Sequence, residues 1–274
     1  MILVNGEAHS DIPATDRGLA YGDGVFRTFP SRQGRPLVWR RQYAKLAHDA
    51  AALKLQTPNV DVLEREVRAV SKDHEGCAVK IVLTRGSGAR GYGYRGDEHV
   101  TRIVSAGPLP PRIAERQAGG VKVRLCSLRL AAQPALAGIK HLNRLENVLA
   151  RAEWNEPDIA EGILCDTQGH VISGTMSNVF VVLDGTLATP RLDLCGVAGV
   201  TRERVIDAAR RAGMPCVVKT LSWTDVLAAH EVFLVNSLAG AWPVCAIDGE
   251  ARALGEVTRA VQRWLEFEDD AEVL

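Results

Sequence analysis

Lys140 is the residue of this sequence with the clearest potential for covalent chemistry. It follows the small apolar residues 136–139 and stands shortly before a predicted helix, with His141 and Arg144 close to it in the chain. Partial burial beside positive charge lowers the pKa of a lysine and supplies the neutral amine that Schiff-base chemistry needs. The alternative is an ordinary solvated lysine, which is what most lysines in globular proteins are.

The helix that follows Lys140 is expected to fix its position. An apolar face with the spacing i, i+3, i+4 and i+7 is formed by Leu145, Val148, Leu149 and Ala152. Asn143, with Glu146 three residues later, predicts an N-cap with a partial capping box. Lys140 is therefore expected just outside the start of a helix.

A second candidate is the glycine-bearing loop at residues 196–201, which leads into a predicted helix at 202–212. The N-terminus of a helix presents unpaired backbone N–H groups and the positive end of its dipole, which favours phosphate. Thr201 adds a hydroxyl group to this loop. Many helices begin at threonine without binding an anion, so a plain N-terminus is the alternative.

A third candidate is the loop at residues 85–97, which follows a predicted strand at 77–84 and carries Arg85, Arg90 and Tyr92. The loop contains a G-x-G-x-x-G pattern, but the residues after it cannot open the apolar helix of a dinucleotide site. Its arginines suit a carboxylate. The alternative is a mobile loop in solvent.

The composition limits the classes of function. The chain has 274 residues, of which 46% are hydrophobic and 24% charged, enough for one large core or two medium ones. Lys plus Arg and Asp plus Glu both number 33, so there is no basic excess to bind nucleic acid. The six cysteines include no C-x-x-C pair, which predicts reduced core residues and no metal site. There is no signal sequence and no membrane span of ~18 apolar residues, so we expect a soluble, cytoplasmic protein.

The Pro-rich residues 107–111 predict a stiff connector between two domains. We place a small N-terminal α/β domain at residues 1–107, a linker at 108–118 and a C-terminal domain at 119–274. Helices are expected at 41–53 and 61–71, and the second half is rich in strand signals, with a last helix at 257–265.

A Schiff-base lysine, a phosphate site and an arginine loop for a carboxylate together suit a pyridoxal-phosphate enzyme that acts on an amino acid-like substrate. The motifs DRGLAYGDGVF, RGSGARGY, GIKHLNRLENV, GTMSNVF and GVTRERV follow one another along the chain. In this order they resemble the fold-type IV pyridoxal-phosphate enzymes, the group of the branched-chain and D-amino acid aminotransferases. The resemblance covers essentially the whole chain. It implies a two-domain α/β (α+β) fold with a larger C-terminal pseudo-barrel domain, pyridoxal 5'-phosphate as cofactor, and a homodimer.

The resemblance also implies roles for single residues. Lys140 would bind the cofactor as a Schiff base and shuttle the proton. The phosphate would be held by Val200 and Thr201, by Asn236 or Ser237, and by Lys45. Most relatives have an arginine where this chain has Lys45, and a point charge can replace the planar fork with some loss of geometry.

Ser173 departs from the family pattern. Relatives usually carry a glutamate here, which keeps the pyridine nitrogen of the cofactor protonated. A serine can form a hydrogen bond with that nitrogen but cannot enforce its charge, so the ring withdraws electrons less strongly. Ser173 therefore puts transamination in more doubt than an elimination driven by formation of an aromatic ring.

Within the family, KHLNRLE and RGSGARGYG resemble most the aminodeoxychorismate lyase branch, whose small-molecule substrate is 4-amino-4-deoxychorismate. The substrate carboxylates would then lie on Arg90, Tyr92 and Arg27, and Phe26 and Arg144 complete the expected substrate site. Two alternatives stay open: an aminotransferase for D-amino acids, branched-chain amino acids or amines, and a cofactor-binding protein without turnover.

Overall fold

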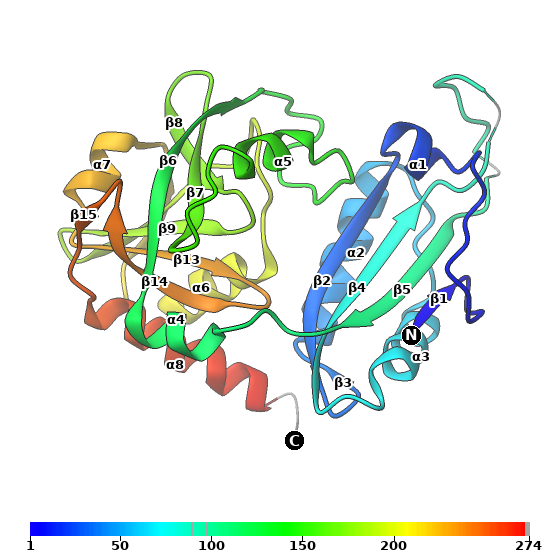
Figure 1. The fold of residues 1–274 in the computed structure, drawn as a ribbon, viewed down its shortest axis with the longest axis horizontal. Coiled ribbons are helices and arrows are strands. Elements are labelled where there is room, and N and C mark those ends of the chain that lie inside the picture. The colour runs from blue at the N-terminus through cyan, green and yellow to red at the C-terminus, as the bar shows by residue number, and fades with distance from the viewer. Residues whose placement is uncertain (89, 97, 272–274) are drawn as a thin grey trace. The chain divides into compact units, whose positions relative to one another are not determined.

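The computed structural model describes residues 1–88, 90–96 and 98–271, and these form two compact units, which we describe separately (Figure 1). The first unit holds residues 1–109 and 139–143, and the second holds 110–138 and 144–270. The first boundary falls within the Pro-rich stretch, while the exact bounds of the predicted domains stay a prediction. Residues 139–143 belong to the first unit, although we had assigned them to the C-terminal domain, because their backbone pairs with a strand of that unit.

The first unit is built on an antiparallel sheet of five strands in the order β1-β5-β4-β2-β3. Its longest pairing joins β2 to β4 from Gly24 opposite Thr84 to Arg32 opposite Gly76. The strands are β1 (Ile2–Val4), β2 (Gly24–Arg32), β3 (Arg35–Pro36), β4 (Gly76–Thr84) and β5 (Thr101–Gly107).

Helices α1 (Arg17–Tyr21), α2 (Trp39–Ala52) and α3 (Val60–Ser71) complete the first unit. The predicted helices at 41–53 and 61–71 are confirmed. Leu46 on α2 and Leu63 on α3 are fully buried and pack into one core with residues of the sheet. This arrangement fixes the orientation of α2, which carries Lys45.

Residues 140–142 continue the first sheet along the edge of β2. The Phe26 N–H donates to the Lys140 carbonyl oxygen at 2.9 Å, and the Leu142 N–H donates to the Gly24 carbonyl oxygen at 2.9 Å. A side chain at position 24 would collide with the carbonyl oxygen of Leu83. Glycine therefore allows β2 to pair on both sides here.

The second unit is built on a mixed sheet of ten strands in the order β11-β10-β9-β13-β14-β6-β7-β8-β12, with β15 paired to β14. The pairs β10–β11, β14–β6 and β6–β7 are parallel. The strands are β6 (Val121–Leu130), β7 (Ile159–Asp166), β8 (His170–Gly174), β9 (Asn178–Leu183), β10 (Thr186–Pro190), β11 (Cys216–Lys219), β12 (Leu221–Ser222), β13 (Glu231–Asn236), β14 (Gly240–Ile247) and β15 (Glu250–Ala251).

Both faces of the second sheet are buried. On β9 and β13, Val179 and Leu234 belong to one hydrophobic core, while Phe180 and Phe233 belong to another and stack with ring centroids 5.1 Å apart. Alternate residues of a strand point to opposite faces, which explains the almost wholly apolar strands. The helices of this unit are α4 (Ile113–Gly119), α5 (Leu145–Arg151), α6 (Val200–Arg211), α7 (Trp223–Ala228) and α8 (Glu256–Ala271).

Four of the cysteines are buried, as predicted: Cys77, Cys126, Cys165 and Cys195. Burial raises the pKa of the Cys126 thiol to about 12. Cys216 and Cys245 are only partly buried. Among the residues that the structure describes, no helix is both long and apolar enough to cross a membrane.

Replacing Phe233 by alanine should lower the free energy of unfolding of the second unit by about 4 kcal/mol, because the fully buried ring leaves a cavity. The measurement is denaturant unfolding followed by tryptophan fluorescence. The control is Phe267→Ala, since Phe267 is 75% exposed and its loss should cost less than about 0.5 kcal/mol. Equal losses in the two variants would contradict the assigned core.

Candidate active site

Lys140 is half-buried and its backbone is held on both sides. Its N–H donates to Asp49 Oδ2 at 3.1 Å, and its carbonyl oxygen accepts the hydrogen bond from Phe26. Its Nζ lies over the ring of Phe26, 4.3 Å from the centroid. The negative face of an aromatic ring attracts a cation and offers the amine an apolar surface. The predicted half-buried lysine before a helix is thus confirmed, because α5 begins at Leu145.

Asp49 on α2 binds both the backbone of Lys140 and the charged side chains near it. Its side chain is fully buried. Asp49 Oδ1 accepts a hydrogen bond from the Lys45 Nζ one helical turn earlier and lies 3.3 Å from the Nδ1 atom of His48. Arg27 Nη1 donates to Oδ2 at 3.4 Å. With Lys45 and Arg27 on one carboxylate, the group carries net positive charge, which suits an anion.

Asp49 was missed by the sequence reasoning. Its spacing of four residues from Lys45 is the signal that could have found it, because side chains at i and i+4 meet on a helix. That spacing does not show, however, that the pair would face residue 140, which lies far away in the chain.

Phe26 and Arg27 are neighbours on β2 and point to opposite faces of the strand. Phe26 faces Lys140, whereas Arg27 is buried and faces Asp49. Burial lowers the pKa of the Arg27 guanidinium below its usual value, and Asp49 partly offsets this effect. Arg27 Nε has no hydrogen-bond partner among the described residues. The contact of Arg27 with a substrate carboxylate stays a prediction.

The predicted N-cap of α5 is wrong. The cap residue is Arg144, which forms no capping hydrogen bond, while its Nη1 lies 3.5 Å from Asn147 Oδ1. Asn143 donates instead to the Gly22 carbonyl oxygen at 3.2 Å. Glu146 accepts from the Ala131 N–H at 2.9 Å. Tertiary partners have replaced the local capping box.

The apolar face of α5, which the spacing of its residues predicted, is not buried within the chain. Leu145 is 74% exposed, and Val148 and Leu149 are each 59% exposed. Three large apolar side chains on one exposed helical face are uncommon in a monomeric protein.

Ser173 lies on β8 and is 7% exposed. The turn that follows it is arranged around the buried carboxylate of Glu161 on β7. This carboxylate accepts hydrogen bonds from the backbone N–H groups of Thr175 and Met176 at 3.0 and 3.1 Å, from Ser177 Oγ at 2.9 Å, and from the Thr175 hydroxyl. Burial raises the pKa of Glu161, and these hydrogen bonds oppose the rise. A lone glutamate in an apolar strand gave no signal in the sequence.

The phosphate candidate is a helix N-terminus, as predicted, although α6 begins at Val200, two residues earlier than expected. Gly199 is the cap residue, and its N–H donates to Asn178 Oδ1 at 3.2 Å. Thr201 is 2% exposed, and its hydroxyl has no hydrogen-bond partner among the described residues. A buried hydroxyl left unpaired at the positive end of a helix fits an anion such as phosphate.

Asn236 and Ser237 follow directly after β13. Asn236 Oδ1 accepts from the N–H groups of Leu238 and Ala239 at 3.0 and 2.8 Å, so it shapes the turn. The roles of both residues in phosphate binding stay predictions.

Arg85, expected in the substrate loop, is buried and forms two hydrogen bonds to Asp23 at 2.8 and 3.0 Å. Burial acts to raise the pKa of Asp23, but hydrogen bonds from Arg85 and Arg17 outweigh it and hold that pKa below its usual value. The expectation that Arg85 holds a ligand carboxylate is therefore wrong, because this arginine already holds one of the protein.

Arg90 and Tyr92 are exposed. Their loop is tied to the first unit by Arg17, which donates to the Gly91 and Tyr92 carbonyl oxygens at 2.9 and 3.0 Å. Their predicted contacts with a substrate stay predictions. Ala89 and Asp97 of this loop lie outside the described residues.

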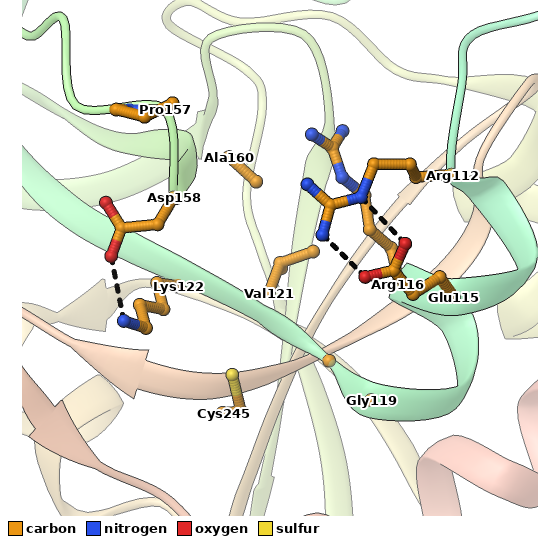
Figure 2. A pocket seen from close by; sticks show the side chains of 11 residues that line it. Arg112, Glu115, Arg116, Gly119, Val121, Lys122, Pro157, Asp158, Ala160 and Cys245 are labelled. Carbon is orange, nitrogen blue, oxygen red and sulfur yellow. Dashed lines mark hydrogen bonds and ion pairs between the residues drawn. The ribbon is translucent and has the colours of Figure 1, made fainter.

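A cavity of about 390 Å³ in the second unit is separate from these residues, since none of the predicted site residues lines it. Figure 2 shows one ion pair at each side of it, Arg112 with Glu115 and Lys122 with Asp158. All four side chains are more than half exposed, so the pairs contribute little stability.

Comparison with known proteins decides the family. The family described as Amino-transferase class IV matches residues 24–247. The chain belongs to this family. It is 37% identical to an aminodeoxychorismate lyase of Vibrio harveyi over 96% of this chain and 98% of that protein. It is 30% identical to a putative branched-chain-amino-acid aminotransferase of Methanocaldococcus jannaschii over 95% and 93%.

Solved structures agree with this assignment. A crystal structure of 4-amino-4-deoxychorismate lyase from Pseudomonas aeruginosa has a TM-score of 0.93 and 40% identity, with 97% of this chain and 98% of that chain covered. A hypothetical aminotransferase from Mycobacterium tuberculosis, in its PLP-bound form, has a TM-score of 0.86 at 22% identity, over 99% of each chain. The predicted fold-type IV α/β class is confirmed.

Replacing Thr201 by valine should weaken binding of the predicted cofactor, pyridoxal phosphate, by roughly tenfold, because a hydroxyl donor to a charged group is lost. The free energy of unfolding of the cofactor-free protein should not fall, since this buried hydroxyl has no other partner among the described residues. Fluorescence titration and denaturant unfolding measure the two quantities.

The matched control is Thr189→Val. Thr189 is also fully buried, but its hydroxyl donates to the Val179 carbonyl oxygen at 2.9 Å. This variant should lose about 1 kcal/mol of stability and keep its affinity for the cofactor. The assignment is contradicted if Thr201→Val binds pyridoxal phosphate as tightly as the unchanged protein.

Proposed function

We propose that this protein is a pyridoxal-phosphate-dependent lyase that converts 4-amino-4-deoxychorismate to p-aminobenzoate and pyruvate. The observation that carries the proposal is the placement of Lys140, whose backbone is fixed by β2 and Asp49 while its amine lies over Phe26. The choice of a lyase is supported by the relatives from Vibrio harveyi and Pseudomonas aeruginosa, which are 37% and 40% identical.

The residues present fit the cofactor. In the second unit, the unpaired Thr201 hydroxyl and the first backbone N–H groups of α6 suit a phosphate. In the first unit, the ammonium of Lys45 is a positive charge of the kind that the resemblance assigns to the phosphate. The ion pair with Asp49 fixes the direction of the Lys45 side chain. This fixed direction partly replaces the rigid geometry that the planar guanidinium of an arginine would provide. When bound, pyridoxal phosphate withdraws electrons from the bonds next to the substrate amine.

Lys140 acts as the base and then as the acid. Its neutral amine removes the proton from C4 of the substrate ring, and that electron pair becomes part of the aromatic ring. The C–O bond to the enolpyruvyl group then breaks, and the released enolate takes up a proton to become pyruvate. Arg90 and Tyr92 would bind the carboxylates, which stay charged throughout and therefore set orientation.

Ser173 favours the lyase over an aminotransferase. Its hydroxyl is neutral and buried, so it cannot keep a pyridine nitrogen charged as a carboxylate would. Aromatisation supplies much of the driving force for the elimination, whereas transamination depends more on the cofactor. An aminotransferase is the second candidate, favoured by the 30% identity to the Methanocaldococcus jannaschii protein.

Lys140→Ala should lower lyase turnover by about 10³-fold or more and abolish the borohydride-reducible visible absorbance of bound pyridoxal phosphate. The assay measures p-aminobenzoate and pyruvate in one tube, and the unchanged protein should form them in equal amounts. The control is Lys72→Ala, because Lys72 is an exposed lysine of the same unit and takes no part in the proposed reaction.

Full lyase turnover in Lys140→Ala would end the proposal. Conversion of the bound cofactor to its amine form by D-alanine, without products from aminodeoxychorismate, would favour the aminotransferase. Binding of the cofactor with neither reaction would identify a protein that has lost turnover.

We further propose that the protein is a homodimer that buries the exposed face of α5. Leu145, Val148 and Leu149 expose a large apolar area, and removing it from water on association is favourable by about 25 cal/mol per Å². The helix follows Lys140 closely in the chain, which would bring the active-site segment near the interface. A cytoplasmic location also stays a proposal, supported by the six unpaired cysteines.

Leu149→Lys should shift the protein from dimer to monomer, because a charge would have to be buried at the contact. Analytical ultracentrifugation at several concentrations measures the change in dimer dissociation constant, which we expect to exceed about 100-fold. Leu227→Lys on α7 is the control, since Leu227 is 44% exposed and lies outside the proposed contact. An unchanged dissociation constant in Leu149→Lys would refute this interface.

A further inference from the structure

We propose that Asp49 is a positioning residue that fixes the segment of Lys140 and sets the ease with which its amine takes and releases a proton. The catalytic consequence rests on the proposed function, whereas the effect on the amine does not. Asp49 lies in the first unit together with all the groups that carry the argument.

The first step of the argument is geometric. Asp49 Oδ2 accepts the backbone N–H of Lys140 at 3.1 Å. This N–H belongs to a segment at the edge of β2, and a half-buried backbone donor needs a partner. A hydrogen bond to a carboxylate is stronger than one to a neutral acceptor. A residue of α2 therefore determines where Lys140 leaves the sheet.

The second step concerns charge. Two cations lie on this carboxylate, Lys45 from α2 and Arg27 from β2, and the ring of His48 lies beside it. On the other face of β2, the ammonium of Lys80 from β4 lies over the same Phe26 ring as Lys140. Asp49 is the carboxylate that Lys45, His48 and Arg27 share. Its burial leaves little water to screen these charges.

The consequence has a definite sign. If the charge of Asp49 is removed, the cations that remain disfavour a proton on the amine of Lys140, and the amine becomes neutral at lower pH. If the charge of Lys45 is removed, the balance becomes more negative and the amine keeps its proton to higher pH. Because proton transfer is most efficient when the group titrates near the working pH, Asp49 controls the acid–base function of Lys140.

The experiment measures the amine directly on the full chain freed of cofactor. Lysines are acetylated briefly at a series of pH values, and the Lys140 peptide is quantified by mass spectrometry against the peptide of the exposed Lys72. In Asp49→Asn, the pH of half-maximal labelling of Lys140 should fall by about one unit, which means about tenfold faster labelling below the midpoint. In Lys45→Met, the midpoint should rise.

The double variant with Asp49→Asn and Lys45→Met separates charge from structure. It has the net charge of the unchanged cluster, so its midpoint should return to within a few tenths of a pH unit. If Asp49 had only a structural role, the labelling midpoint of the double variant would differ from that of the unchanged protein at least as much as the midpoint of Asp49→Asn does. Glu66→Gln is the matched control, because Glu66 is another buried carboxylate of this unit, paired with Arg102 at 2.7 Å. It should leave the midpoint unchanged.

The proposal is overturned if Asp49→Asn has the midpoint of the unchanged protein, or if the double variant stays with Asp49→Asn. If Asp49→Asn does not fold, the absence of a rise in Lys45→Met overturns it equally. If the midpoint shifts as expected in Asp49→Asn but the unchanged protein has no lyase activity, the proposed function alone is refuted. If the unchanged protein is an active lyase but the midpoint does not shift in Asp49→Asn, this inference alone is refuted.

Discussion

The pairing of residues 140–142 with the edge of β2 is the constraint on which the candidate active site depends. Two backbone hydrogen bonds of 2.9 Å fix the segment along the strand, and the buried carboxylate of Asp49 holds it from α2. Lysine side chains are long and mobile, and most of their entropy is lost when they are ordered. A fixed backbone, with the ring of Phe26 beneath the amine, reduces the freedom that remains to Lys140.

Each unit contains a buried carboxylate that holds a segment with predicted site residues. In the first unit Asp49 holds Lys140 and Lys45, and in the second Glu161 holds the turn after Ser173. Burying a carboxylate is costly unless hydrogen bonds satisfy it, and both of these are surrounded by donors. Because such groups accept bonds from several directions at once, they fix loops more firmly than apolar packing does. Lys45 donates a hydrogen bond to Asp49, and Ser173 lies just before the turn that Glu161 holds.

The exposed apolar face of α5 is the observation on which the proposed dimer rests. Its apolar spacing is that of a buried helix, yet Leu145, Val148 and Leu149 are all more than half exposed. An amphipathic pattern records that a face avoids water, but not whether the same chain or another covers it.

The sequence by itself determined the α/β class, the positions of the long helices of the first unit and the strands of the second, and the family. It also indicated Lys140 and the helix N-terminus that holds Thr201, because these depend on short-range spacing and on residue type. It could not indicate the contacts of Asp49 and Glu161. Asp49 contacts a residue that is distant in the chain, and nothing in the sequence sets Glu161 apart from the other carboxylates. The predictions that Asn143 caps a helix and that Arg85 binds a ligand carboxylate are wrong for the same reason. Asn143 and Arg85 bind Gly22 and Asp23 instead, which the fold brings close to them. Local propensities and motifs depend on neighbouring residues and can therefore be read from the sequence. The direction of a side chain depends on partners that only the folded chain brings close to it.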